Sequence, residues 1–334
     1  MTQFYKTMFL STLISGSLIA ISSHSWLSMW IGLEINLLSI IPLLSEPKNI
    51  FPSESALKYF ITQALASVIL LFSVITNLNL HEFITSNQNL YLNMILNSAL
   101  LTKMGAAPFH AWFPEVMEGI SWINGLIMLT WQKLAPMVIL MYSVKMTFFL
   151  SIIIITSSVI GSILGLNQIS LRKIMAYSSI NHISWMIASM LEAQQIWLTY
   201  FISYTIITAN IVLIFHVSEI FYLKQLFNYF NFNKMMKFFF ILNFLSLGGL
   251  PPFFGFLPKW LTINSLIQNN FFFMSLILII TTLVTLFFYL RISFSTLIIK
   301  SMEISMLNQK PKIFFLSFLN LISLTGLTTC TLIF

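Results

Sequence analysis

The chain has 334 residues, of which 58% are hydrophobic and only 7% are charged, and it carries a formal net charge of +7 and a single cysteine, Cys330. Soluble domains contain about a quarter charged residues, so the composition excludes that class and predicts a polytopic membrane protein. Long continuous apolar runs exclude a β-barrel. Because the lysines are scattered and lack an aromatic-basic motif, nucleic acid is not an expected partner.

A helix needs about 20 apolar residues to cross a bilayer. By this measure we predict an all-α fold with about 11 transmembrane helices. In chain order the expected spans are 4–21, 25–44, 56–78, 90–118, 121–145, 148–167, 172–191, 195–222, 237–268, 271–299 and 313–333.

The fourth span is expected to be broken around residues 103–115. Pro108 lacks a backbone donor and blocks a helix, and Gly105 is a weak helix former. Such a break at membrane depth persists only where it is buried in protein or faces a watery cavity. Lys103, His110 and Glu115 accompany this break.

A similar pattern returns in the ninth span. Gly249, Pro252 and Pro258 repeat the spacing of Gly105, Pro108 and Pro114, and 258 − 114 gives an offset of 144 residues. The second break, around 248–259, also carries a lysine, Lys259. Two interrupted segments in matching places indicate the binding or conduction site of a transporter. The alternative is a pair of proline-kinked helices that serve only in packing.

The distribution of basic residues predicts the orientation of the chain. Ten basic residues are expected at the N-terminus and in every second loop: Lys6, Lys48, Arg172, Lys173, Lys224, Lys234, Lys237, Lys300, Lys310 and Lys312. The positive-inside rule places these segments on the inner face. The N-terminus is therefore expected inside and the C-terminus outside. The broken helices are an odd number of spans apart, so they cross in opposite directions. We predict two inverted five-helix repeats, 1–146 and 147–300, followed by a C-terminal loop and helix, 301–334.

Four charged residues are expected near the middle of the membrane. Glu34, Lys103, Lys133 and Lys259 would together cost on the order of 10–14 kcal/mol if they were unpaired, at about 2.5–3.5 kcal/mol each. An amine removed from water gives up its proton more readily, so these lysines are candidate proton carriers. Glu34 and Lys103 are an expected charge-coupled pair. The alternative is that all four form static ion pairs.

The histidines give weaker signals. His110 lies in the first break and could relay protons between lysines, whereas His182 is expected to make a hydrogen bond between helices. No two histidines have the spacing of a metal or haem site, and a single cysteine excludes a cysteine-based cluster. The sequence contains no dinucleotide-binding or P-loop motif.

Five stretches resemble one family. They are 30–36 (WIGLEIN), 105–115 (GAAPFHAWFPE), 129–136 (LTWQKLAP), 172–180 (RKIMAYSSI) and 249–260 (GLPPFFGFLPKW). Together they resemble the antiporter-like membrane-arm subunits of respiratory complex I, NADH–ubiquinone oxidoreductase, and among these the mitochondrial chain 2 family. The resemblance extends over nearly the whole chain.

This resemblance implies proton translocation coupled to NADH:ubiquinone oxidoreduction. It implies a relay of Glu34, Lys103, His110, Lys133 and Lys259, with no cofactor and no metal in this chain. FMN, iron–sulfur clusters and ubiquinone are then expected in other subunits. The expected partners are other membrane-arm subunits and phospholipids, including cardiolipin. The expected location is the mitochondrial inner membrane, with the N-terminus on the matrix side and the C-terminus on the intermembrane-space side.

Two other functions stay open on the sequence alone. A cation/proton antiporter subunit shares the inverted repeat and the midplane lysines. A structural membrane-arm scaffold would use the same charges only to hold helices together. Replacement of Lys133 by leucine separates the scaffold, which should lose assembly, from a transporter, which should lose transport.

Overall fold

The computed structural model describes residues 2–46, 49–80, 88–144, 146–230, 234–298 and 320. Within these residues the chain is helical, apart from an isolated β-bridge between Ser170 and Tyr222, as the all-α prediction requires. The helices are α1 (Thr2–Ser22), α2 (Trp26–Leu44), α3 (Ile50–Leu80), α4 (Gln88–Met104), α5 (Trp112–Gly119), α6 (Trp122–Leu129), α7 (Trp131–Met141), α8 (Thr147–Leu166), α9 (Leu171–Glu192), α10 (Gln194–Ser218), α11 (Leu223–Phe230), α12 (Lys234–Gly248), α13 (Phe256–Gln268) and α14 (Phe272–Ile298).

The helices match the predicted spans closely. Seven helical segments of the described chain are long and apolar enough to cross a membrane, and the fourth and ninth spans are present as the pairs α4–α5 and α12–α13. The eleventh span, 313–333, within the expected C-terminal segment 301–334, lies outside the described residues except for Asn320. Lys48, Lys145, Lys300, Lys310 and Lys312 also lie outside them.

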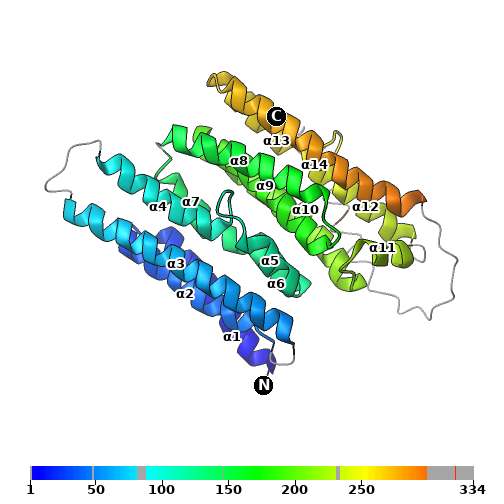
Figure 1. Cartoon of the computed structure of the whole chain (residues 1–334), viewed down its shortest axis with the longest axis horizontal. Helices are drawn as coiled ribbons and strands as arrows, with labels where there is room; N and C mark the ends of the chain where they lie inside the picture. Colours follow the sequence, from blue (N-terminus) through cyan, green and yellow to red (C-terminus); the bar gives the residue numbers. More distant parts are fainter. Residues whose placement is uncertain are drawn as a thin grey trace. The chain divides into compact units, whose positions relative to one another are not determined.

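The chain divides into two compact units, Met1–Thr156 and Ser157–Phe334, with the boundary inside α8. In the first unit, α1 packs along α2, and α3 contacts α2, α4 and α5 (Figure 1). The helix α7 contacts α1, α2 and α4. The helix α4, which carries Lys103 in its last turn, thus packs against both α3 and α7, and α7 carries Lys133. The expected repeat boundary after residue 146 stays a prediction.

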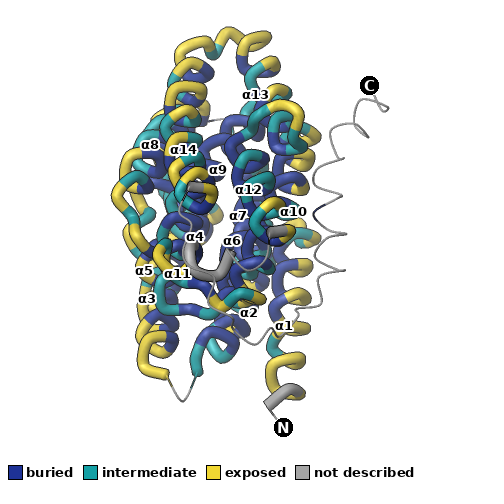
Figure 2. The backbone as a smooth tube through the Cα atoms, turned by 90° about the vertical axis from the view of Figure 1, so that its right-hand side faces the viewer, coloured by how far each residue is buried: buried dark blue, intermediate teal, exposed yellow. Residues whose placement is uncertain are grey.

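In the second unit, the buried helix is α9. It contacts α10 and α13, while α12 packs against α10 and α14. Most residues of α9 are buried, whereas α1 carries a largely exposed surface (Figure 2). A helix that is buried on all sides belongs to the core of its unit. His182 and Trp185, both on α9, are therefore core residues.

The two breaks share a backbone conformation. Gly105 has a φ of +75° and Gly249 a φ of +76°, and a cis peptide bond precedes both Pro108 and Pro252. A positive φ of this size favours glycine because in other residues the Cβ comes too close to neighbouring backbone atoms. The glycine–proline spacing that the sequence repeats therefore specifies the same interruption twice.

Two local features differ from the prediction. The fifth span, expected as one helix over 121–145, is interrupted at Thr130, where α6 ends and α7 begins. Thr130 has a φ of −117° and a ψ of −70°, and its hydroxyl donates to the carbonyl of Leu126 at 2.7 Å. The short helix α11 was not predicted either, because it is much shorter than a membrane span.

Candidate functional site

Three lysines are buried in the described part of the chain, and each lies beside a helix interruption. Lys103 is in the last turn of α4, Lys133 is in the first turn of α7 after the interruption at Thr130, and Lys259 is in the first turn of α13. Their exposed fractions are 7%, 1% and 7%. A buried charge needs partners, so the surroundings of each amine determine what it can do.

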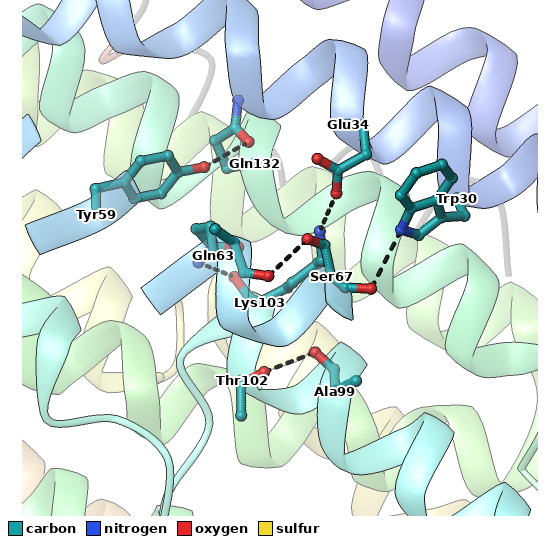
Figure 3. Close-up of polar contacts among 10 residues, drawn as sticks. Trp30, Glu34, Tyr59, Gln63, Ser67, Ala99, Thr102, Lys103 and Gln132 are labelled. Atoms are coloured by element: carbon teal, nitrogen blue, oxygen red, sulfur yellow. Dashed lines mark hydrogen bonds and ion pairs between the residues drawn. The ribbon is translucent and has the colours of Figure 1, made fainter. Parts of the chain in front are cut away.

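Lys103 faces Glu34. The lysine Nζ lies 3.7 Å from Glu34 Oε1, which joins the last turn of α4 to the middle of α2 (Figure 3). The side chains are 4% and 25% exposed, respectively. The pair expected from the sequence is thus present in the structure. A cation near the C-terminal end of a helix also interacts favourably with the helix dipole.

Side chains of α2 and α3 set this geometry. The indole Nε1 of Trp30 donates to the carbonyl of Ser67 at 3.2 Å, which ties α2 to α3. Glu34 follows Trp30 by four residues, so both lie on one face of α2. Figure 3 shows Glu34 and Trp30 extending from α2 towards the residues of α3 and α4.

Neutral donors satisfy the end of α4. The last carbonyls of a helix have no partner within it. The amide of Gln63 donates to the Lys103 carbonyl at 3.4 Å, and the Trp112 indole donates to the Thr102 carbonyl at 3.1 Å. Thr156 Oγ1 donates to the Ala107 carbonyl at 3.1 Å. These bonds supply the protein contacts that a break at membrane depth requires.

A small polar cavity adjoins Lys103. Its volume is about 10 Å³ and its polar lining comes from Asn36, Tyr59, Gln63, Lys103 and Gln132. The Gln132 Nε2 donates to Asn36 Oδ1 at 2.9 Å, and the Tyr59 hydroxyl lies 3.4 Å from Gln132 Oε1. A site of this size and polarity can hold a water molecule. These neutral residues were not among the predicted site residues, although amides within apolar spans are a visible signal in the sequence.

Lys133 is the most deeply buried of the three lysines. Its Nζ lies 5.3 Å from the centre of the Phe113 ring. This distance permits a cation–π interaction, and Phe113 belongs to α5, the second half of the fourth span. Lys133, on α7 of the fifth span, therefore contacts the second half of the broken fourth span, whose first half carries Lys103.

His110 occupies a different environment. Its Nδ1 lies 3.3 Å from the carbonyl of Pro108, and the side chain is only partly buried. Within the described residues, neither a hydrogen bond nor an ion pair joins it to Lys103 or Lys133. The structure thus places His110 in the break, where its described hydrogen-bonding contact is with the Pro108 carbonyl.

Lys259 is held by backbone carbonyls. Its Nζ donates to the carbonyl of Gly248 at 2.9 Å and to that of Leu247 at 3.2 Å, at the end of α12. The ring of Trp185 lies on another side, with its centre 5.9 Å from Nζ. The amine thus lies at the carbonyl end of α12, the first half of the broken ninth span, and beside the ring of Trp185. We call this position, formed by the Leu247 and Gly248 carbonyls, the seat of Lys259.

His182 lies near this seat. Its Nδ1 lies 2.9 Å from the Tyr200 hydroxyl, which links α9 to α10 as expected for a histidine between helices. Both line a cavity of about 10 Å³ together with Tyr204, Ser203, Ser246 and Leu247. Leu247 is also one of the two residues whose carbonyls accept from Lys259.

All of these groups are capable of exchanging protons. A carboxylate, three amines and imidazoles accept and release protons, and a small polar cavity adjoins the Lys103 amine. A second cavity, with a mostly apolar lining, borders Leu247, whose carbonyl accepts from Lys259. Among the described residues, no group of three His, Cys, Asp or Glu side chains has the geometry to hold a metal ion.

Comparisons with known proteins identify relatives of the whole chain. The family profile described as NADH:quinone oxidoreductase/Mrp antiporter, TM, matches residues 23–285. NADH-ubiquinone oxidoreductase chain 2 of Anopheles gambiae is 48% identical over 340 aligned positions, which cover 100% of this chain and 99% of the relative.

Solved structures share the fold. A chain of respiratory complex I from Thermus thermophilus aligns with a TM-score of 0.85 at 23% identity, covering 97% of this chain and 78% of that one. A chain of the Mrp complex from a Dietzia species aligns with a TM-score of 0.75 at 14% identity, covering 85% of this chain and 59% of that one. The antiporter-like fold predicted from the sequence is confirmed.

Proposed function

This chain belongs to the NADH-ubiquinone oxidoreductase chain 2 family, and from that premise we propose that it moves protons through the membrane arm of a respiratory complex I. As a family member it is a subunit of an H⁺-translocating NADH:ubiquinone reductase. The chain itself contributes proton transfer, and the redox steps occur elsewhere in the complex.

The proposed relay uses Glu34, Lys103, His110, Lys133 and Lys259. The observation that carries it is the buried Lys103 amine, 3.7 Å from Glu34 and beside a polar cavity of about 10 Å³. Lys103 takes a proton from the inner side while the charge on Glu34 tunes its affinity. The proton passes by way of Lys133, with His110 or water assisting, and leaves through Lys259.

The driving force reaches this chain as a change in neighbouring charges. Two opposite unit charges about 4 Å apart attract by about 4 kcal/mol at an effective dielectric constant of 20. A shift of charge near Glu34 would therefore alter how tightly Lys103 holds its proton. Quinone reduction in another subunit supplies that shift in this proposal.

The surroundings of the chain follow from the same proposal. Its partners are other complex I membrane-arm subunits, and cardiolipin is a candidate lipid where basic side chains meet the headgroups. FMN, iron–sulfur clusters and ubiquinone belong to other subunits. The location is the mitochondrial inner membrane, with the N-terminus in the matrix and the C-terminus facing the intermembrane space.

The second candidate function is an antiporter subunit, which the shared fold with the Mrp chain favours. Purification of native membranes in mild detergent distinguishes the two. The proposal requires this chain to co-purify with NADH:quinone reductase activity, and proton uptake into reconstituted vesicles should start on addition of NADH and quinone. Proton flux driven by a sodium gradient, without reductase activity in the same fraction, would instead support the antiporter.

A further inference from the structure

The seat of Lys259 is built from the end of a half-helix. The carbonyls of Leu247 and Gly248 lie in the last turn of α12, where no intrahelical donor reaches them. The negative end of the helix dipole is also located there. The Lys259 ammonium donates to both carbonyls, so a cationic side chain from α13 completes the end of α12.

Gly249 lies directly against that lysine. A Cβ built at position 249 would be 2.7 Å from Lys259 Cδ, 3.0 Å from Nζ and 3.1 Å from Cε. Contacts this short require a shift of the atoms involved. The absence of a side chain at 249 therefore leaves the space that the end of the lysine side chain occupies.

The first break lacks this arrangement. Gly105 has almost the same φ, but a Cβ there would approach Phe113 Cβ at 3.1 Å and the rings of Phe113 and Trp112, with no atom of Lys103 among the nearest neighbours. At that break, Gln63 and Trp112 satisfy the helix end, and Lys103 faces Glu34 instead. The two breaks thus share a backbone conformation, but Lys103 faces a carboxylate whereas Lys259 is bound by backbone carbonyls.

We propose that Gly249 is a positioning residue for proton transfer, because its missing side chain allows the Lys259 ammonium to dock on the Leu247 and Gly248 carbonyls. This inference rests on the proposed role of Lys259 in the relay. The docked amine is held by fixed backbone dipoles, whereas the Lys103 amine faces a titratable carboxylate. The cavity lined by His182 and Tyr200 also borders Leu247, and most of its lining surface is apolar.

Gly249→Ala, introduced into the assembled complex, tests this placement. We expect the rate of NADH-driven proton pumping to fall about tenfold or more, because displacement of a reacting group by about 1 Å can cost about 100-fold in rate. Gly125→Ala, in α6 and outside the Lys259 site, is the matched control: its Cβ would meet Met117 Cε at 3.4 Å and Ile120 Cδ1 at 3.9 Å, which is ordinary contact. Gly105→Ala measures the cost of a positive φ without the lysine contact.

A double-mutant cycle separates positioning from a general structural role. If Gly249 acts through the lysine, Gly249→Ala combined with Lys259→Ala should pump as Lys259→Ala does alone, since the side chain that the new Cβ would meet is gone. Its assembly should differ from that of Lys259→Ala only by the backbone cost that Gly105→Ala measures. This expectation holds even if Gly249→Ala by itself fails to assemble. A cryo-EM map of Gly249→Ala should show the Lys259 amine moved off the two carbonyls.

Each outcome decides one of the two claims. Normal pumping by Lys259→Ala would overturn the proposed relay. Loss of pumping in Lys259→Ala together with normal pumping in Gly249→Ala, or with additive losses in the double variant, would overturn only the positioning role. A loss in Gly125→Ala equal to that in Gly249→Ala would overturn it as well.

Discussion

The Lys103 amine lies 3.7 Å from the Glu34 carboxylate, a separation longer than a hydrogen bond and short enough for strong electrostatic attraction. Among the described residues, Glu34 Oε1 has no hydrogen-bond partner. The interaction is therefore mainly between charges. It can weaken or strengthen as either group gains or loses a proton, without a large movement of the helices.

Glu34→Gln removes the charge and keeps the size of the side chain. The Lys103 amine would then be buried without its anion, so the protonated form becomes costly. We expect the complex to assemble and the rate of coupled proton pumping to fall severalfold. Reconstituted vesicles, with NADH oxidation and proton uptake recorded together, provide the measurement.

The control for this change is Glu46→Gln. Glu46 lies just beyond α2, and its Oε2 accepts a hydrogen bond from Asn49 at an exposed position. Pumping by this variant should match the unmodified complex. Equal losses in both glutamine variants would mean that the effect comes from altered assembly rather than from the charge beside Lys103.

Lys133→Met distinguishes a proton carrier from a scaffold. Methionine has nearly the length of lysine and a similar volume, so the side chain at 133 can still pack beside Phe113. We therefore expect normal assembly on a native gel and a large loss of pumping. If assembly collapses and the remaining complex pumps normally, Lys133 serves in structure.

Lys58→Met is expected to have little effect on pumping. Lys58 lies 3.0 Å from Glu54 and 3.1 Å from Glu115, with a side chain that is 44% exposed. Ion pairs at exposed positions contribute little because water and salt screen them. Proton uptake per NADH should stay at the level of the unmodified complex, and a loss as large as that of Lys133→Met would refute the division of lysines into surface and relay groups.

Gln132→Leu tests the polar cavity beside Lys103. The change removes the donor to Asn36 and the acceptor near Tyr59, and an unsatisfied buried amide costs about 1–3 kcal/mol. We expect a moderate loss of stability, measured by thermal inactivation of the complex, and a pumping rate reduced severalfold. Gln195→Leu, on the exposed surface of α10, should change neither quantity.

Much of the fold was predictable because apolar length determines a membrane span. The predicted 25–44 and 172–191 correspond to α2 (Trp26–Leu44) and α9 (Leu171–Glu192). The breaks at Gly105 and Gly249 followed from glycine and proline at repeated spacing. The interruption at Thr130 could not be predicted in this way. Pro136, inside α7, indicates a missing backbone donor but does not indicate the residue at which the helix is interrupted.

The site was predictable in part. A charge at membrane depth is conspicuous, so Glu34, Lys103, Lys133 and Lys259 could be selected from the sequence, and two opposite charges indicated a pair. The carbonyl seat of Lys259 could not be foreseen, since it depends on α13 folding back onto the end of α12. The participation of these residues in proton transfer stays a prediction.

The ratio of protons pumped to NADH oxidised in a Lys103→Met complex tests most directly whether Lys103 carries protons. Methionine fills a similar volume but cannot carry a proton. If Lys103 carries protons, the complex should assemble and its ratio should fall well below that of the unmodified complex measured in the same vesicles. An unchanged ratio in fully assembled Lys103→Met complex would contradict it.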